Sequence, residues 1–256
     1  MAQFKGKVLI CLSGVDYITL KSGRKQKTGC FLKELTQPLG KLLAAGYSVE
    51  FANPNGSAPA LDPMSLSGVW FLPWVGELAV QQKLLAQVAE STNFKAPRRF
   101  ADISDKELVS GMYAGVFLPG GHAPLEDLKA NADLGRILLH FHKAQRPTAI
   151  ICHAPIALLS AQMAAPGKPW AYTGYKLTVY SNTEEMLNDL MWWDTVPKAE
   201  TALRKAGAAV RVSWPLFPHI IRDRELITGQ GPTSALALGD ALVAALKAAP
   251  PAAVVH

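Results

Sequence analysis

The stretch from residue 8 to residue 52, VLICLSGVDYITLKSGRKQKTGCFLKELTQPLGKLLAAGYSVEFA, decides the fold class. Residues 8–12 are a continuous apolar run, which is typical of a strand buried on both faces of a parallel sheet. Leucines recur at helical spacing across residues 29–45, and Gly46 supplies a stop signal. Residues 48–52 read as a second strand. A strand, a helix and a strand in this order predict a βαβ unit.

The rest of the chain repeats this pattern. Strands are expected at residues 115–118, 148–151, 176–180, 209–212 and 225–228, and helices at residues 124–143, 198–205 and 233–247. A helix that opens at Pro155 and a helical stretch ending near Leu190 are also expected. The pattern predicts an open, doubly wound α/β fold, flavodoxin-like, with a mostly parallel sheet flanked by helices. Ligands should bind at the carboxyl ends of its strands.

Residues 54–112 break the alternation of strands and helices. They are rich in Pro, Gly and Ser, they contain Trp70 and Trp74, and they include a helical segment at residues 77–90. We interpret them as an insertion that caps a site, because aromatic side chains are unusually concentrated there for a connector. The alternative is that these aromatics pack against the parent domain. Residues 1–256 are expected to form one domain, with residues 248–256 as a loose tail.

Composition limits the function classes. Of 256 residues, 49% are hydrophobic and 18% are charged, and the net charge is 26 − 20 = +6, which excludes a mainly disordered chain. Three cysteines are too few for a disulfide scaffold and suggest reduced thiols in the cytoplasm. The first apolar run is too short for a signal peptide or a membrane span. Residues 21–27, KSGRKQK, hold four basic residues without aromatics, so we predict a solvated loop and no nucleic-acid or membrane partner.

Cys152 is the first candidate for chemistry. In residues 149–157, AIICHAPIA, an apolar strand runs straight into this cysteine, and Pro155 suits the first turn of a helix. This pattern predicts a nucleophile elbow at the positive end of a helix dipole, where the thiolate should be favoured and its pKa should fall. Cys11 lies inside an apolar strand and is expected to be structural. Cys30 is left undecided, because it lies close to a candidate acid.

Two histidine segments accompany the cysteine. His153 follows it directly, but adjacent side chains at an elbow diverge, so adjacency alone does not bring the imidazole to the thiol. Residues 119–122, PGGH, follow a strand, and the Gly120 and Gly121 backbone could approach a ligand closely and donate N–H groups to an oxyanion next to His122. His140 and His142 are two apart on a helix and point in different directions, so no metal site is predicted from them.

Glu34 is the third candidate. It lies on the first helix between Phe31 and Leu35, at the border of the buried face. A solvated glutamate is the ordinary interpretation of such a position. If the side chain turns inward beside a thiolate, burial and like charge would raise its pKa and let it give and take protons near neutrality.

At these residues the chain resembles the DJ-1/PfpI superfamily of the class I glutamine amidotransferase-like fold. Residues 149–155 resemble its nucleophile elbow, residues 118–122 its oxyanion loop, and residues 27–38 the segment that carries its buried glutamate. Residues 173–185 and 226–232 are most similar to its class of glutathione-independent glyoxalases and heat-shock chaperones of the thirty-one-kilodalton type. The resemblance spans nearly the whole chain.

The resemblance implies roles for these residues. Cys152 would be the nucleophile, His153 its partner and Glu34 the acid beside the thiol. The third carboxylate would be Glu185, with Glu184 as its close competitor. Backbone N–H groups of Gly121 and His153 would stabilise the oxyanion as methylglyoxal is converted to lactate through a hemithioacetal. No metal, nucleotide or thiol cofactor is implied, and a homodimer is expected.

Other functions stay open at this point. Deglycation of early glycated amines would use the same residues. A holdase chaperone would use exposed apolar surface such as residues 70–74, and a redox sensor would oxidise Cys152 to a sulfinate beside Glu34. A peptidase is the weakest alternative, because residues 54–112 would cover the cleft it needs. Trp70, Trp170 and Trp193 are candidate walls of the substrate pocket.

Overall fold

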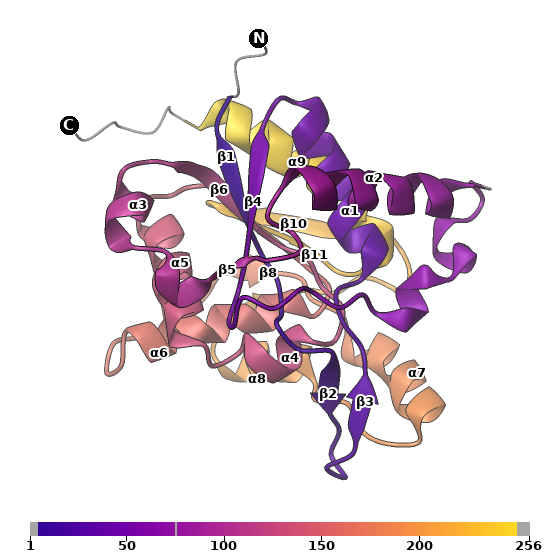
Figure 1. Cartoon of the computed structure of the whole chain (residues 1–256). Coiled ribbons are helices and arrows are strands. Elements are labelled where there is room, and N and C mark those ends of the chain that lie inside the picture. Colours follow the sequence, from indigo (N-terminus) through magenta and orange to yellow (C-terminus); the bar gives the residue numbers. More distant parts are fainter. Residues whose placement is uncertain (1–4, 75, 250–256) are drawn as a thin grey trace.

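The computed structural model describes residues 5–74 and 76–249, and a seven-stranded sheet forms its centre (Figure 1). In spatial order the strands are β10 (Ile220–Asp223), β11 (Leu226–Gly229), β7 (Thr148–Ile151), β6 (Tyr113–Leu118), β1 (Lys7–Cys11), β4 (Ser48–Asn53) and β5 (Arg98–Arg99). Every neighbouring pair in this sheet is parallel except β10 with β11. The predicted α/β fold with a mostly parallel sheet is therefore confirmed.

Helices cover both faces of the sheet (Figure 1). On one face lie α1 (Leu32–Ala44) and α9 (Ala235–Ala248), with α2 (Glu77–Ser91) packed outside α1; α5 (Ala132–Lys143) and α6 (Ser160–Ala164) lie on the other. The apolar residues of strand β1 contribute to the hydrophobic core on both faces of the sheet. Leu9 and Cys11 pack in the core under α5, and Val8 and Ile10 pack in the core under α1. Alternating side chains of a buried strand point to opposite faces, so a fully apolar run fills two cores.

Several predicted elements differ in detail. The predicted helix at residues 124–143 is interrupted, because Asn131 ends the connection after α4 (Pro124–Asp127) and caps α5 by accepting the Leu134 N–H at 2.9 Å. The predicted strand at residues 176–180 is limited to β8 (Lys176–Leu177), which pairs with β9 (Ala209–Val210) outside the main sheet. The basic run belongs to a hairpin of β2 (Tyr17–Thr19) and β3 (Lys25–Lys27): residues 21–24 form the exposed turn, as predicted, and residues 25–27 form a strand. Strand β10 was not predicted.

The segment predicted as an insertion has two parts. Its first part holds two short 3-10 helices, η1 (Pro63–Leu66) and η2 (Gly68–Phe71). Its second part belongs to the fold itself, because α2 packs on α1 and β5 extends the sheet beyond β4, followed by η3 (Phe100–Asp102) and α3 (Asp105–Val109). The remaining elements are η4 (Ala154–Leu159), α7 (Asn182–Trp192), α8 (Ala199–Lys205) and η5 (Pro232–Ser234). Most of the predicted tail lies outside the described residues.

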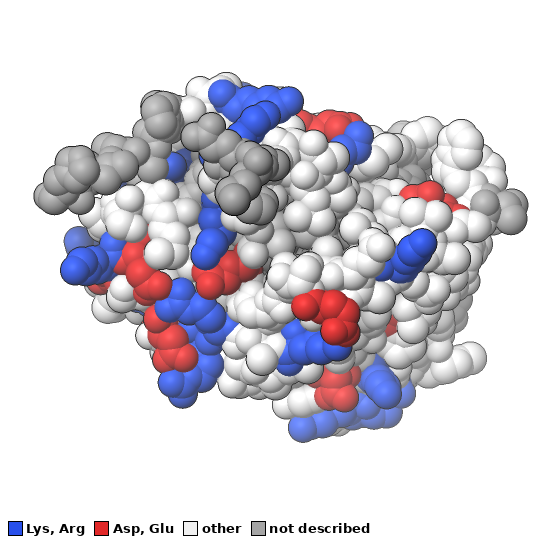
Figure 2. All heavy atoms as spheres, turned by 45° about the horizontal axis from the view of Figure 1, so that its top comes forward, with Lys and Arg blue, Asp and Glu red and all other residues white. Residues whose placement is uncertain are grey.

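The surface carries both signs of charge. On the face in Figure 2, Lys and Arg side chains lie next to Asp and Glu side chains instead of gathering into one basic field. On the hairpin, the Lys25 ammonium faces an aromatic ring: its Nζ lies 3.8 Å from the centre of the Tyr17 ring. Within the described part of the chain, no helix is long and apolar enough to cross a membrane.

Candidate active site

Cys152 occupies the sharp turn between β7 and η4, at the carboxyl end of the sheet. Its φ is +64°, a left-handed conformation that costs an L-residue energy and is held only when its surroundings impose it. The surroundings do so from both sides, because the Cys152 N–H donates to Gly229 O and its carbonyl accepts from Tyr180 N–H, each at 2.9 Å. The predicted strand, cysteine and following turn therefore form a strained elbow.

Two glycines let the neighbouring loop reach the elbow. A Cβ at Gly120 would lie 2.5 Å from the Cys152 Cβ and 2.5 Å from Glu34 Oε2. At Gly121 φ is +103°, and a Cβ there would lie 2.0 Å from Gly29 O. The backbone N–H groups of Gly121 and His153 lie against the Cys152 sulfur and favour its charged form. This is the donor arrangement that an oxyanion site requires.

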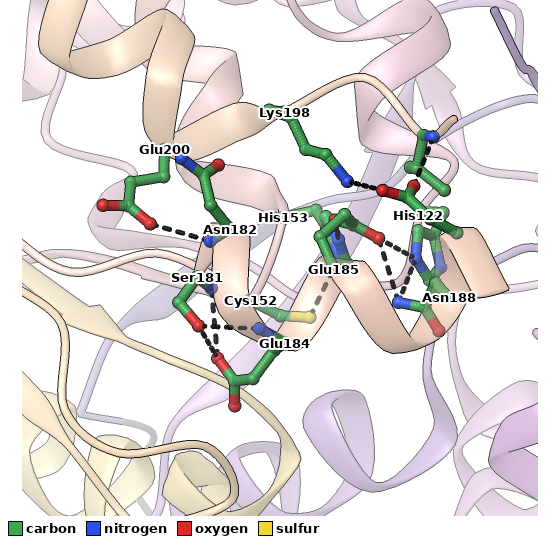
Figure 3. A network of polar contacts seen from close by, with 12 residues as sticks. His122, Cys152, His153, Ser181, Asn182, Glu184, Glu185, Asn188, Lys198 and Glu200 are labelled. Carbon is green, nitrogen blue, oxygen red and sulfur yellow. Dashed lines mark hydrogen bonds and ion pairs between the residues drawn. The ribbon is translucent and has the colours of Figure 1, made fainter. Parts of the chain in front are cut away.

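His153 reaches the thiol although it is the adjacent residue. Its Nδ1 lies 3.2 Å from the Cys152 Sγ, and its Nε2 lies 2.6 Å from Glu185 Oε2 (Figure 3). Burial and the nearby charge of His122 lower the pKa of His153. Burial opposes the charge on Glu185, but His153 and His122 together hold the pKa of this carboxyl well below its usual range. A carboxylate at Nε2 fixes the proton there, which leaves Nδ1 as an acceptor facing the thiol.

Glu184 and Glu185 have different partners. Glu184 forms a capping box with Ser181 at the start of α7 (Figure 3). It also accepts a hydrogen bond from Gln230 Nε2 at 2.9 Å. Glu185 is one residue further along and faces the two histidines. Of the two competing carboxylates, Glu185 is the one in line with the cysteine and His153.

Glu34 turns inward from α1 and is fully buried. Within the described part of the chain, neither of its carboxyl oxygens has a hydrogen-bond partner that meets ordinary geometry. Burial raises its pKa to about 8, while the Cys152 thiol, the His122 charge and the Gly120 N–H offset part of this shift. The carboxyl therefore carries a proton near neutrality. The Glu34 carboxyl and the Cys152 side chain lie close together beside Gly120, since a Cβ at Gly120 would be 2.5 Å from each of them.

The prediction of a lowered cysteine pKa was wrong. Burial, and next the charge of Glu34, raise the pKa of the Cys152 thiol well above its usual range, although the Gly121 and His153 N–H groups act against this. The elbow is only 3% exposed, and the element after it is a short 3-10 helix instead of a long α-helix with a full dipole. Cys152 is thus a thiol at rest and must lose its proton to a neighbour as it reacts.

Four of the residues weighed in the sequence, Cys11, Cys30, His140 and His142, are not part of this group. Cys11 is buried in β1, as expected, and Cys30 is buried with its pKa raised by burial and by the charges of Glu34 and Asp62. His142 contacts Glu225, with 2.8 Å between Nδ1 and Oε1, at the opposite end of the strands. His140 does not share that contact.

His122 stands between two carboxylates. Its Nε2 lies 3.3 Å from Glu185 Oε1, its Nδ1 lies 3.9 Å from Asp62 Oδ2, and its ring stacks 4.1 Å from the His153 ring. Burial disfavours the cation, but Asp62 and Glu185 outweigh burial and raise the pKa of His122 to about 9. Thr28 Oγ1 donates to Asp62 at 2.6 Å and holds it in place.

Sequence reasoning missed Asp62, Thr28 and Asn188. Asp62 precedes Pro63 and accepts the Met64 N–H at 2.8 Å, so its only readable signal was that of a cap for η1. Asn188 donates to Glu185 Oε1 at 2.9 Å and has no distinctive motif.

A metal could also find ligands here. The ligand atoms of His122, His153 and Glu185 lie within 4.8 Å of one another, and two imidazoles with one carboxylate form a donor set that suits zinc. An ion bound there would replace the hydrogen bond between His153 Nε2 and the Glu185 carboxylate. The two functions of these residues, holding a metal and orienting His153, therefore exclude one another.

A cavity of about 190 Å³ opens onto Cys152. Its walls come from segments that flank the sheet edge, and its lining residues are Phe31, Asp62, Met64, Trp70, Gly121, His122, Cys152, His153, Tyr180, Leu187, Asn188, Met191, Leu216 and Pro232. Of the three tryptophans expected in the walls, Trp70 lines the cavity. The expectation was wrong for Trp170, which is buried elsewhere and donates a hydrogen bond to Leu158 O at 2.8 Å. It was also wrong for Trp193, which is 89% exposed at the end of α7.

The fold and this geometry define a class of proteins: α/β proteins with a cysteine on the strained turn after a parallel strand and a histidine and a carboxylate in line with it. The chain belongs to the DJ-1/PfpI family, whose family model matches residues 29–245. The predicted superfamily is thereby confirmed.

The names of similar proteins include two different activities. A curated relative is the protein/nucleic acid deglycase HchA of Staphylococcus aureus, 28% identical over 247 residues that cover 92% of this chain and 78% of the relative. Solved structures with the same fold include the rapid encystment protein of Francisella tularensis (TM-score 0.76, 23% identity, 94% of this chain and 99% of the other). Glyoxalase III from Candida albicans is another (TM-score 0.74, 22% identity, 94% and 97%).

Proposed function

We propose that this protein is a glutathione-independent glyoxalase, a lyase that converts methylglyoxal and similar 2-oxoaldehydes into 2-hydroxy acids. The observation that carries the proposal is the position of Cys152 beside two groups that can move protons. His153 Nδ1 lies 3.2 Å from its sulfur, and the buried Glu34 carboxyl meets it across Gly120. Moving a proton between two adjacent carbons of the substrate needs a nucleophile and groups that accept and donate protons, all within reach of the same atoms.

The first step is attack on the aldehyde. As the Cys152 sulfur bonds to the aldehyde carbon, its proton passes to His153 Nδ1, and Glu185 stabilises the imidazolium that forms. The carbonyl oxygen becomes an oxyanion beside the Gly121 and His153 N–H groups. Glu34, protonated at rest, gives its proton to this oxygen, which produces a neutral hemithioacetal and leaves Glu34 as a carboxylate.

The second step moves a hydrogen along the substrate. The Glu34 carboxylate takes the proton from the carbon bonded to sulfur, and His153 gives its proton to the neighbouring carbonyl oxygen, so an enediol forms. Glu34 then returns its proton to the neighbouring carbon while His153 takes the hydroxyl proton beside sulfur. The product is a thioester of the 2-hydroxy acid. Water then attacks its carbonyl carbon, the Glu34 carboxylate takes a proton from that water, and the His153 imidazolium gives its proton to the departing Cys152 sulfur, so the acid leaves and all three groups return to their starting protonation states.

Deglycation is the second candidate function. The observation that favours it is the name of the Staphylococcus aureus relative, a protein/nucleic acid deglycase similar to 92% of this chain. The same cysteine would attack the carbon of a glycated amine, and the same carriers would move the protons. A free-methylglyoxal scavenger separates the two: adduct reversal by a glyoxalase stops when the free aldehyde is removed, whereas direct deglycation continues.

The test is lactate formation from methylglyoxal without glutathione or added metal. We expect turnover by the wild type and a loss of at least about a hundredfold in both Cys152→Ala and Glu34→Gln. Circular dichroism of both variants serves as the control for folding. A folded wild type that makes no lactate would overturn the proposal.

Assembly and compartment are proposals of the same kind. We infer a homodimer from the family resemblance, which sedimentation velocity would test, and a reducing cytoplasmic compartment from the three free thiols. The holdase hypothesis gains support from Trp74, which is exposed, and stays a prediction together with the redox-sensor hypothesis. Suppression of aggregation that survives Cys152→Ala would separate a holdase role from catalysis.

A further inference from the structure

We propose that the preferred substrate is a neutral 2-oxoaldehyde whose substituent is apolar and larger than the methyl group of methylglyoxal, with an aromatic ring as the best fit. This inference rests on the proposed glyoxalase function and adds its substrate class. The cavity walls, their exposure, their charge and their size all point to it.

The cavity has a polar floor and an apolar wall. The polar residues that line it are buried and contact one another: Cys152 contacts His153, and Asn188 and His122 both contact Glu185 beneath them. By contrast Leu187, Met191 and Leu216 are each at least half exposed, so they stand at the mouth. A dicarbonyl held at Cys152 would therefore extend its substituent along the apolar wall.

Charge at the cavity excludes an anionic substituent. Among the described residues that line it, none is Lys or Arg. The His122 ring, which also lines it, already faces the carboxylates of Asp62 and Glu185. A carboxylate or phosphate on the substrate would lose its water shell without gaining a free counter-ion, which is costly in a buried site.

Size and shape favour an aromatic substituent. The cavity of about 190 Å³ is far larger than the roughly 10–15 Å³ that one water molecule needs, so a methyl group would leave much of it unfilled. Phe31 and Trp70 stand edge to face, with 5.2 Å between ring centres, and both line it. Aromatic groups prefer such offset and edge-to-face contacts, so an aromatic substituent gains contacts with these two rings that a methyl group does not.

The reaction balances for any such substituent R. The sulfur of Cys152 adds to R–CO–CHO and gives R–CO–CH(OH)–S–Cys; the proton shift gives R–CH(OH)–CO–S–Cys. Water then breaks the C–S bond and yields R–CH(OH)–COOH and the free thiol. No oxidant or reductant takes part. Phenylglyoxal would give mandelate where methylglyoxal gives lactate.

The experiment compares phenylglyoxal with methylglyoxal in the wild type and in two leucine variants. Leu187 and Leu190 both lie on α7 and are similarly exposed, 59% and 66%, but of the two only Leu187 lines the cavity. Replacement of either costs little stability, and comparing the two variants cancels the intrinsic reactivity of the aldehydes. The measurement is kcat/KM for each substrate.

We expect kcat/KM for phenylglyoxal to exceed that for methylglyoxal by about tenfold in the wild type, since apolar groups in a fitting pocket discriminate by about this factor. Leu187→Ala should lower the ratio about threefold, and Leu190→Ala should leave it unchanged. A para-carboxyphenylglyoxal probe should be a poorer substrate than phenylglyoxal.

Two outcomes would overturn the inference: methylglyoxal turned over as well as phenylglyoxal, or equal ratios in Leu187→Ala and Leu190→Ala. Both leave the glyoxalase function intact, because acids still form. If neither aldehyde yields a hydroxy acid, the proposed function itself fails, and the two failures are thereby distinguished.

Discussion

The floor and the wall of the cavity are built on opposite principles. The floor, which includes Cys152, His153 and His122, is buried at the ends of β7 and β6 and carries charge. Behind it, at the start of α1, lies the buried Glu34 carboxyl, which has no hydrogen-bond partner of ordinary geometry among the described residues. The wall comes from α7, the loop that carries Leu216 and the segment of η1 and η2, and it is apolar and largely open. The buried polar groups of the floor lower the stability of the fold but are needed for the chemistry, whereas residues of the wall can be substituted without disturbing the floor.

The sharpest test of the floor is the pair of adjacent glutamates. Glu185→Gln keeps the shape of the side chain but presents an amide to His153 Nε2, which favours the tautomer with its proton on Nδ1 and removes the acceptor that the thiol needs. We expect kcat for 2-oxoaldehyde turnover to fall by about a hundredfold or more. Steady-state kinetics on folded protein measures this.

Glu184→Gln is the matched control. Glu184 is just as buried and also hydrogen-bonded, but its partners are Ser181, Gln230 and the Leu216 N–H. Its replacement should lower stability by about 1 kcal/mol and change kcat by no more than about threefold. Equal losses of kcat in the two variants would mean that Glu185 has no special relation to His153.

The same contrast explains how much the sequence could predict. The floor was readable, because apolar runs, glycines and a cysteine at a strand end are local signals, and parallel strands bring such ends to one edge of a sheet. The choice between Glu184 and Glu185, and the reach of His153, depended on side-chain directions that sequence does not carry. The wall was mostly unreadable, because Leu187 lies on an exposed helix face and Leu216 on an irregular segment, where ordinary residues acquire a role only from packing.

The second prediction concerns the stability cost of Glu34. Its pKa is raised to about 8 in the folded protein against an ordinary value of 4.5, so the folded state holds a proton that the unfolded chain releases between these pH values. The free energy of unfolding should therefore fall as pH rises through this window, by up to about 1.4 kcal/mol per pH unit from this group.

Glu34→Gln carries no such proton. Relative to wild type, the variant should gain about 2 kcal/mol of stability between pH 5.5 and pH 7.5, measured as the difference in free energy from urea unfolding. If the difference in free energy of unfolding between the two proteins does not change with pH, Glu34 is ionised in the folded state. Glu34 could then not act as the acid of the proposed mechanism.

The smallest expected effect tests the one feature that floor and wall share. Cys152 on the floor and Leu216 on the wall both have positive φ, +64° and +65°. Glycine adopts this conformation without the Cβ clash, so at each position the Gly variant should exceed the Ala variant by about 1 kcal/mol in free energy of unfolding. Only at residue 152 should both variants lose turnover of methylglyoxal, while both Leu216 variants should retain it within about threefold. If glycine is no better than alanine at residue 152 but is better at residue 216, the elbow is relaxed and its geometry comes from packing alone.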